Sequence, residues 1–308
     1  MTTRMHSGQE NDVLKRLERI VDRVETVIDA AFPAVFQEMP EFGAYWTFRW
    51  ERIGNRGRIV PVKLPDLIDL DDLVGIDLAK SELIRNTEQF VEGYPANNVL
   101  LWGERGNGKS SCVKGLLGRF ASCGLRIVEV QRWELLHLPE IIALLRDAPY
   151  RFILFCDDLS FAEGEADYRG LKTLLDGGVE ARPANVLIYA TSNRRHLMPE
   201  PMTDNVGGGE IHPEEAISEK LSLSDRFGLT LGFTTFDQEL FLAIVEHHAG
   251  RLGIPLDSEK LRSEALLWAL YSGRRSGRSA RQFVDDLAGR LRIKAVNRDL
   301  DTANRVDE

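Results

Sequence analysis

The chain is poor in cysteine and contains no long hydrophobic run. Its 308 residues include three cysteines, at positions that fit neither a disulfide framework nor a paired metal-ligand spacing. Apolar runs such as residues 152–156 fall far short of the roughly 20 residues that a membrane-spanning helix needs. The first residues also lack the apolar stretch of a secretory signal. These absences predict a cytoplasmic protein without a membrane span.

The overall composition is that of a globular protein with an uneven charge. Hydrophobic residues make up 43% of the chain and charged residues 28%, and a chain of this length can bury a large core. The net charge of −9 argues against a general coating of nucleic acid. Residues 271–298, however, contain eight basic and two acidic side chains. A local anion site near the C-terminus is therefore compatible with the acidic total.

Changes in hydrophobic pattern divide the chain into four predicted parts. From residue 65, short apolar runs alternate with helical stretches, which favours a parallel sheet covered on both faces. After residue 233 the pattern is helical only, with expected helices at 237–252, 258–271 and 279–296. The predicted parts are an N-terminal helix plus small β segment at 1–64, an α/β domain at 65–235, a helical domain at 236–297 and a flexible tail at 298–308.

The first 64 residues leave two alternatives open. Apolar positions between Glu10 and Phe32 alternate steps of three and four, which predicts a helix. Its broad stripe favours packing on the chain's own core over a coiled-coil arm. Next, Trp46, Phe48 and Trp50 alternate as on a strand, with arginines nearby. Core packing is the favoured interpretation, and a stacking platform for single-stranded nucleic acid is the alternative.

The segment GERGNGKS at residues 103–110 matches the phosphate-loop pattern, between an apolar strand and a helix. Glycines let successive backbone N–H groups surround phosphates, and the helix N-terminus adds favourable partial charge. Lys109 is predicted to reach the β- and γ-phosphates, and the Ser110 hydroxyl to ligate Mg²⁺. The predicted nucleotide-binding residues of this segment are Gly103, Glu104, Arg105, Gly106, Asn107, Gly108, Lys109, Ser110 and Ser111.

A second motif follows about 50 residues later, where an apolar strand ends in two acids. Asp157 is predicted to hold Mg²⁺ through water, and Asp158 to polarise the attacking water. No guanine-reading N/T-K-x-D segment follows this strand. Leu73, Val74 and Ile76, together with apolar side chains of the helical domain, are instead predicted to form a slot for adenine. The sequence thus predicts binding of ATP with Mg²⁺.

With these motifs in order, residues 65–296 resemble the AAA+ ATPases. The resemblance rests on the box at 73–77, Walker A at 103–110, Walker B at 152–158, ATSN at 190–193, SDRF at 224–227 and GRSAR at 277–281. The sequence around these motifs resembles a bacterial AAA+ branch known mainly as a domain of unknown function. Asp158 departs from the pattern, because most AAA+ proteins carry glutamate there. The shorter side chain predicts slow hydrolysis. Some initiator-type relatives also carry aspartate at this position, so the substitution does not imply an inactive enzyme.

The resemblance implies a fold and a set of roles. The fold would be a parallel-sheet P-loop NTPase core with a small all-helical C-terminal lid and an N-terminal helix and hairpin extension. Asn193 would orient the water or contact the γ-phosphate, and Arg226 would be an arginine finger for a neighbouring subunit. Arg281 would link lid position to phosphate state, with Arg278 as its rival. Arg194, Arg195 and His196 are weaker candidates for a subunit interface.

The leading hypothesis is an ATPase that hydrolyses ATP at subunit interfaces and drives conformational work on an unknown client. The resemblance implies a homo-oligomeric ring, with a hexamer as the expected size, and a protein client is favoured over nucleic acid. The alternative is an ATP-dependent switch or loader with slow, partner-stimulated hydrolysis. Asp158 motivates it, as does the lack of an aromatic-Val-Gly pore motif around Trp133. A small-molecule kinase is the least favoured, since it needs no separate helical domain.

Overall fold

The computed structural model describes most of the chain from residue 40 to residue 304. The residues described are 20–21, 23–24, 40–54, 56–161, 171–172, 175, 182–195, 197 and 223–304, with side chains up to 293. Most of the helix predicted at 10–32 lies outside these residues, as do residue 196 and the segment 198–222. None of the described helices has the length and apolar character needed to cross a bilayer.

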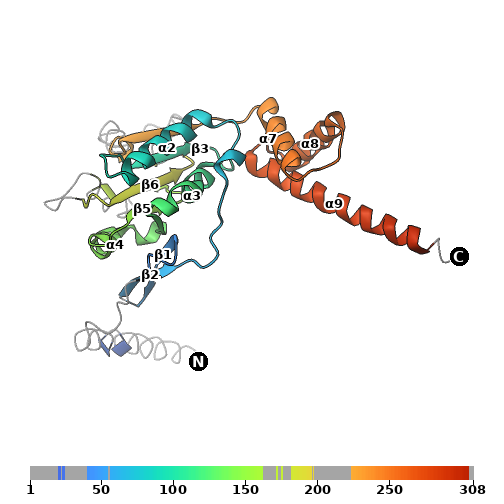
Figure 1. Ribbon diagram of the computed structural model, residues 1–308. Coiled ribbons are helices and arrows are strands. Elements are labelled where there is room, and N and C mark those ends of the chain that lie inside the picture. The colour runs from blue at the N-terminus through green and yellow to red at the C-terminus, as the bar shows by residue number, and fades with distance from the viewer. Residues whose placement is uncertain are drawn as a thin grey trace, which may run out of the picture.

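Within the described residues, seven strands form one sheet, in the order β2-β1-β4-β5-β6-β3-β7 (Figure 1). Every neighbouring pair is parallel except the β1–β2 hairpin. The strands are β1 (Thr47–Ile53), β2 (Arg56–Pro61), β3 (Val99–Gly103), β4 (Leu125–Glu129), β5 (Arg151–Cys156), β6 (Val186–Ser192) and β7 (Leu229–Phe233). The predicted α/β class with a mainly parallel sheet is confirmed.

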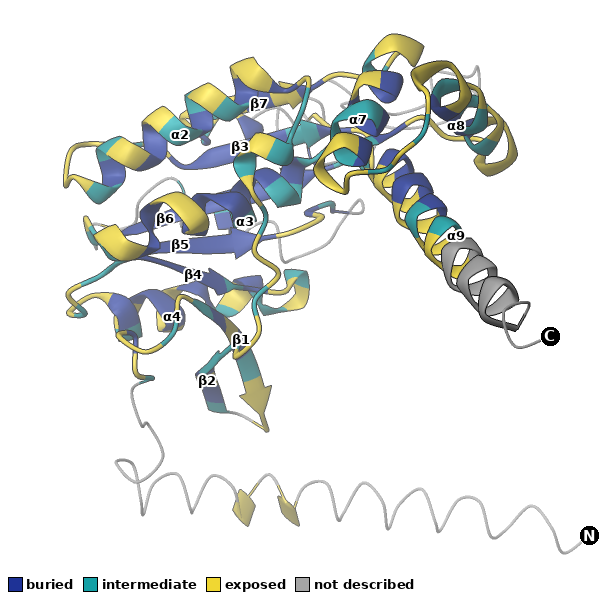
Figure 2. Ribbon diagram, turned by 45° about the vertical axis from the view of Figure 1, so that its right-hand side comes forward, coloured by how far each residue is buried: buried dark blue, intermediate teal, exposed yellow. Residues whose placement is uncertain are grey.

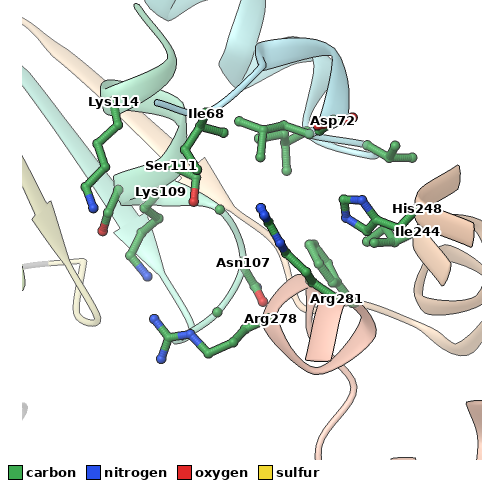
Figure 3. Close-up of a pocket in the computed structure, with 18 of the residues that line it drawn as sticks. Ile68, Asp72, Asn107, Lys109, Ser111, Lys114, Ile244, His248, Arg278 and Arg281 are labelled. Carbon is green, nitrogen blue, oxygen red and sulfur yellow. The ribbon is translucent and has the colours of Figure 1, made fainter. Parts of the chain in front are cut away.

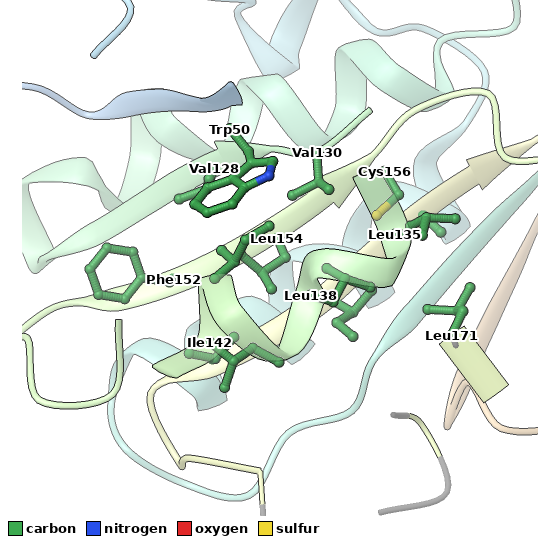
Figure 4. Packing of buried hydrophobic residues seen from close by; sticks show 14 of the residues in the cluster. Trp50, Val128, Val130, Leu135, Leu138, Ile142, Phe152, Leu154, Cys156 and Leu171 are labelled. Carbon is green, nitrogen blue, oxygen red and sulfur yellow. The ribbon is translucent and has the colours of Figure 1, made fainter. Parts of the chain in front are cut away.

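Helices cover both faces of this sheet, which explains why its central strands read as unbroken apolar runs (Figure 2). Every residue of β6 is buried. Alternate residues of β5 enter two different cores: Leu154 packs in one with α4 (Leu138–Leu145). Ile153 packs in the other with α2 (Asp77–Val91) and α3 (Lys109–Phe120). Figure 4 shows the first of these cores around Leu154 and Leu138.

The N-terminal hairpin belongs to the main sheet, which the sequence had not indicated. β1 pairs in parallel with β4, opposite residues 127–129. Phe48 and Trp50 are buried in the α4 core, at 1% and 3% exposure, whereas Trp46 is 42% exposed. The core interpretation of this alternation therefore holds for Phe48 and Trp50. The predicted boundary at residue 64 separates the hairpin from a sheet to which it is hydrogen-bonded.

The C-terminal part is helical, with a core of its own. It consists of α7 (Gln238–Arg251), α8 (Ser258–Ser272) and α9 (Gly277–Asn304), packed around Phe241, Ala265 and Phe283. Side chains cap each helix start: Asp237 and Asp257 accept backbone N–H groups of α7 and α8, and Ser276 accepts one from α9.

Helix α9 is longer than the predicted span of 279–296 and enters the segment expected to be a tail. It continues to Asn304. Residues 297–304 contain neither glycine nor proline, so no local signal ends the helix there. The helix thus extends to Asn304 into the segment expected to be a tail, whose flexibility stays a prediction.

Candidate active site

The candidate residues converge because three strands that carry them are neighbours. β3 pairs in parallel with β6, and β6 with β5. The carboxyl ends of parallel neighbours meet at one edge of a sheet. The phosphate loop after β3, the two acids after β5 and Asn193 after β6 therefore lie together, although up to 90 residues separate them in the chain.

The phosphate loop has a backbone that requires glycine. Gly103 has φ of 144°, and a Cβ there would lie 2.2 Å from the carbonyl oxygen of Phe233. Gly108, with φ of 91°, immediately precedes α3. The Asn107 side-chain amide donates to the Thr234 carbonyl at 2.7 Å and so attaches the loop to the end of β7. The loop is thus held with the N-terminus of α3 open to an anion.

The Lys109 ammonium group is buried at the centre of the site. It donates to two carbonyl oxygens of the phosphate loop, both at 2.7 Å, and to Asn193 Oδ1 at 3.3 Å. Burial lowers the pKa of Lys109, while the nearby carboxylates of Asp158 and Asp157 oppose this effect. Its partners are neutral oxygens of the loop and of Asn193, and negatively charged phosphate oxygens would form stronger bonds with the ammonium group.

Ser110 and Asp157 form an oxygen-rich pair beside Lys109. Ser110 Oγ donates to Asp157 Oδ1 at 2.6 Å, and the Thr191 hydroxyl donates to the same oxygen. A serine hydroxyl and a carboxylate are hard oxygen ligands, and Mg²⁺ bound beside phosphates typically takes only one or two such protein ligands. The donor set therefore fits Mg²⁺, with Ser110 and Asp157 as the residues that would hold it.

Asp158 has an unusual backbone and several polar partners. Its φ is 52°, in the left-handed region, and its N–H donates to Thr191 Oγ1 at 2.9 Å. Its carboxylate accepts a hydrogen bond from the Asn193 amide and pairs with Arg105, 3.1 Å from Nη2 to Oδ2. Aspartate adopts left-handed backbone angles more readily than most residues. The backbone thus provides a physical reason for aspartate at this position.

A cavity of about 380 Å³ opens on the phosphate loop, between the sheet and the helical part (Figure 3). This volume lies within the range of small-molecule sites. Lys109, Ser110, Ser111 and Asp157 line its polar side. Its apolar lining consists of Ile68, Leu73, Val74, Ile76, Phe236 and Ile244. The cavity, named here the nucleotide cavity, thus brings the predicted Val74 and Ile76 together with the loop.

Several lining residues of the nucleotide cavity were not anticipated from the sequence. Ile244 and His248 lie one turn apart on α7 and so share a helix face. Asp66, Asp72 and Lys114 also line the cavity. None of these residues belongs to a motif; the four-residue spacing on α7 is the one sequence signal that could have grouped two of them.

Arg278 and Arg281 both enter the nucleotide cavity from α9, at different places (Figure 3). The Arg278 N–H donates to the Gly106 carbonyl at 3.2 Å. The positive charge of Arg278 contributes to the lowered pKa of Lys109, whereas that of Arg281 contributes to the lowered pKa of His248. Arg278 therefore lies on the phosphate-loop side, and Arg281 on the α7 side.

The catalytic candidates Asp158 and Asn193 line a different cavity of about 590 Å³. This second cavity shares no lining residue with the nucleotide cavity, and the phosphate loop contributes to both. Its lining residues are Glu104, Arg105, Asp158, Ser160, Asn193, Arg194 and residues 273–276. Arg274 and Arg275, between α8 and α9, were seen in the sequence only as part of a basic stretch.

Arg226, the predicted arginine finger, lines neither cavity. It is half-buried after Leu223, to whose carbonyl its N–H donates. Arg195 stacks over the Trp102 ring at 5.4 Å rather than joining Arg194 in the second cavity. A role of Arg226 toward a neighbouring subunit stays a prediction, and His196 lies outside the described residues.

Charged contacts join the segment before α2 to helix α7. In the 3₁₀ turn η1 (Leu70–Asp72), Asp72 Oδ1 lies 3.1 Å from His247 Nε2 and 3.3 Å from Arg251 Nε. Arg251 also pairs with Asp69. Ligand atoms of Asp72, His247 and His248 lie within 4.8 Å of one another, but the Arg251 guanidinium already occupies Asp72 and would repel a cation. These residues are better described as a set of ion pairs that holds α7 against the segment before α2.

The chain is similar to known proteins in both sequence and structure. Residues 43–291 match the family described as "Protein of unknown function (DUF815)". The chain is 29% identical over 175 residues to the Dictyostelium discoideum "Probable mitochondrial chaperone BCS1-A". That alignment covers 48% of this chain and 39% of the relative, so the chain spans about two fifths of the relative's length.

Solved structures of Thermotoga maritima RuvB are similar in fold. The RuvB Holliday junction branch migration motor shows 15% identity and a TM-score of 0.43, covering 72% of each chain. A RuvB mutant shows 15% identity and a TM-score of 0.48, covering 70% of this chain and 63% of that one. Likeness at this level is too low to carry functional information.

Proposed function

Because the chain belongs to the family described as "Protein of unknown function (DUF815)", and has an AAA+ P-loop architecture, we propose that it hydrolyses ATP at subunit interfaces to drive conformational work. One observation carries this proposal. Lys109, at the start of α3, hydrogen-bonds both the phosphate loop and Asn193, and Asn193 in turn hydrogen-bonds Asp158. A phosphate-binding cation is thereby connected to the groups that can orient water.

Binding of ATP follows from the lining of the nucleotide cavity. The triphosphate would lie on the glycine loop and the α3 N-terminus, where Lys109 exchanges carbonyl oxygens for phosphate oxygens. The apolar wall that includes Val74 and Ile76 would take adenine. Mg²⁺, when bound by Ser110 and Asp157, would supply charge neutralisation at the phosphates.

Hydrolysis would use the residues that line the second cavity. Asp158 would accept a hydrogen bond from the attacking water, and Asn193 would fix the position of the Asp158 carboxylate. Lys109 would stabilise negative charge that develops on the transferred phosphoryl group. Arg226, which lines neither cavity of its own chain, would do the same in a neighbouring copy.

The helical part would convert the nucleotide state into movement. Arg278 joins α9 to the phosphate loop through Gly106, and both α9 arginines face the nucleotide cavity. Loss of the γ-phosphate would weaken the attraction between these arginines and the bound nucleotide, and would so release α9. The proposed assembly is a homo-oligomeric ring, expected to be hexameric, acting on a protein client, since a net charge of −9 disfavours nucleic acid. The three unpaired cysteines fit the reducing cytoplasm.

A switch with slow hydrolysis is the second candidate function, and one contact favours it. Asp158, which must polarise water, is paired with Arg105 and hydrogen-bonded to Asn193. A switch would show a burst of one turnover and then stop until its partner is added. A motor would turn over continuously once assembled, and phosphate release over time separates the two.

Two substitutions test the ATPase proposal. Lys109→Ala should abolish ATP binding in calorimetry, because Lys109 is the one buried cation among the described residues that line the nucleotide cavity. Asp158→Asn should retain ATP binding, and its rate of phosphate release should fall about 100-fold, as is typical when a catalytic base is removed. Arg85→Ala, which breaks an exposed pair on α2, is the control and should change neither. Wild-type turnover by Asp158→Asn would overturn the proposed role.

A further inference from the structure

The second cavity has the charge of an anion site that ATP binding does not explain. Four arginines line it from three separate segments: Arg105 from the phosphate loop, Arg194 from beyond β6, and Arg274 with Arg275 from the α8–α9 connection. Glu104 and Asp158 are the two carboxylates among them. The cavity therefore carries excess positive charge in a protein whose total is −9.

One of these arginines is already paired with a carboxylate. Arg105 Nη2 lies 3.1 Å from Asp158 Oδ2, and the two side chains are 69% and 55% exposed. Exposed ion pairs of this kind contribute little to stability and exchange partners readily. A further carboxylate, brought into the cavity by a ligand, would meet the Arg105 guanidinium together with Arg274 and Arg275.

We propose that the second cavity is a docking site for an acidic segment of a partner protein, whose carboxylate takes Arg105 from Asp158. The released Asp158 keeps its hydrogen bond from Asn193 and gains a free oxygen for the attacking water. Docking thus raises the rate of hydrolysis. This activation rests on the proposed ATPase function, whereas docking itself does not.

A protein carboxylate suits this site better than a nucleic acid. The basic side chains surround one cavity of about 590 Å³ that already contains two carboxylates, and the rest of the chain would repel a long polyanion. Two exposed apolar side chains precede Gly273 of the cavity in the chain: Leu270 and Tyr271, at 76% and 87% exposure. An acidic peptide with apolar neighbours matches both features.

Docking is tested by fluorescence anisotropy with a labelled peptide of alternating glutamate and leucine residues. A glutamine-leucine peptide serves as the uncharged control. The glutamate peptide should bind, and the double variant Arg274→Gln/Arg275→Gln should bind it at least about tenfold more weakly, as expected for lost charge-assisted contacts. The double variant Arg290→Gln/Arg292→Gln removes the same charge from α9 outside the cavity and should bind like wild type.

Two binding results would overturn the proposal. Equal affinity in both double variants would show that the arginines of the cavity are not used. Tighter binding of a labelled oligothymidylate, lost in Arg274→Gln/Arg275→Gln, would assign the cavity to nucleic acid. Neither measurement requires hydrolysis, so failure of the ATPase proposal would leave the docking result intact.

Activation is tested by phosphate release at saturating ATP. The glutamate peptide should raise wild-type turnover, and Arg105→Gln should raise it without peptide, by no more than about fivefold, the size that one exposed ion pair supports. The peptide should then add nothing further to Arg105→Gln. A fall in turnover for Arg105→Gln, with ATP binding unchanged, would show that Arg105 acts on the phosphates and would overturn the release of Asp158.

Discussion

At the scale of single residues, the two α9 arginines differ in what surrounds them. Arg278 is attached to the phosphate loop through Gly106 and influences the pKa of Lys109. Arg281 instead influences the pKa of His248 on α7, and lies 4.0 Å from Asp285. Because the γ-phosphate would lie near Lys109, we expect Arg278 to distinguish ATP from ADP. We expect Arg281 to contact parts that both nucleotides share.

We therefore predict that substitutions of the two arginines change the affinities for ATP and ADP differently. Arg278→Ala should weaken the binding of ATP about tenfold and the binding of ADP much less, since a charge-assisted contact to the γ-phosphate would be lost. Arg281→Ala should weaken both nucleotides by similar factors. Calorimetric titration of each variant with ATP and ADP measures this directly. If Arg281→Ala alone removed the preference for ATP, the lid sensor would be Arg281, as first expected from the sequence.

Asp158 leads to a prediction about the backbone rather than the chemistry. Its φ of 52° is tolerated by aspartate and asparagine but costs a longer side chain such as glutamate on the order of 1 kcal/mol. Asp158→Glu should therefore unfold about 2 °C below wild type, and Asp158→Asn close to wild type. Thermal unfolding by circular dichroism is the measurement. A glutamate variant of wild-type stability would show that the backbone does not select aspartate.

At the scale of elements, helix α7 carries a histidine that resists protonation. Burial lowers the pKa of His248 below its usual 6.5. Asp72 of η1 and Asp285 of α9 favour the protonated form, whereas His247 and Arg281 oppose it. Since the unfolded chain binds a proton here more readily than the folded one, acidification favours unfolding. The stability contributed by neutral His248 is present above pH 6.5 and is lost as the pH falls below it.

The corresponding prediction concerns the pH dependence of stability. Wild-type stability should decline as the pH falls below 6.5, and His248→Gln should show a shallower decline. Arg85→Ala, which removes an exposed ion pair on α2, is the control and should retain the wild-type slope. Urea midpoints measured across that pH range supply the slopes. Identical slopes in wild type and His248→Gln would place the responsible group elsewhere.

Helices and strands near motifs could be predicted from sequence, whereas their lateral order could not. The apolar run that ends at Gly103 predicts β3, and Asp237 predicts the start of α7, because both signals are local. The pairing of β1 with β4 joins segments about 80 residues apart and depends on burial of Phe48 and Trp50 against α4. No local pattern states that contact. The C-terminal end of helix α9 could not be predicted for the opposite reason: the sequence contains no local signal that ends the helix at residue 296.

At the scale of the molecule, the sheet order decides which site residues meet. β6 lies between β5 and β3, so Asn193 lies between Asp158 and Lys109 and hydrogen-bonds both. The sequence predicted that these residues would form one site. It could not predict their division between two cavities, or the Arg105–Asp158 pair, because both depend on side-chain directions around the phosphate loop.

The position of Arg226 leads to a prediction about assembly. Since Arg226 lines neither cavity of its own chain, its proposed partner is the site of a neighbour. Arg226→Ala subunits would retain an intact ATP site without a finger, and Lys109→Ala subunits would retain the finger without a usable site. Each variant alone should be inactive. Their mixture should create interfaces that combine one intact site with one intact finger.

Equal amounts of Arg226→Ala and Lys109→Ala, mixed under conditions that allow subunit exchange, should recover about a quarter of wild-type phosphate release, the fraction of productive neighbours in a randomly mixed ring. A mixture of Lys109→Ala with Asp158→Asn is the control and should stay inactive, because neither subunit contains a complete site. Absence of recovery despite subunit exchange, shown by energy transfer between labelled chains, would mean that Arg226 does not act on a neighbour. Turnover that is unchanged in Arg226→Ala alone would mean that each chain completes its own site.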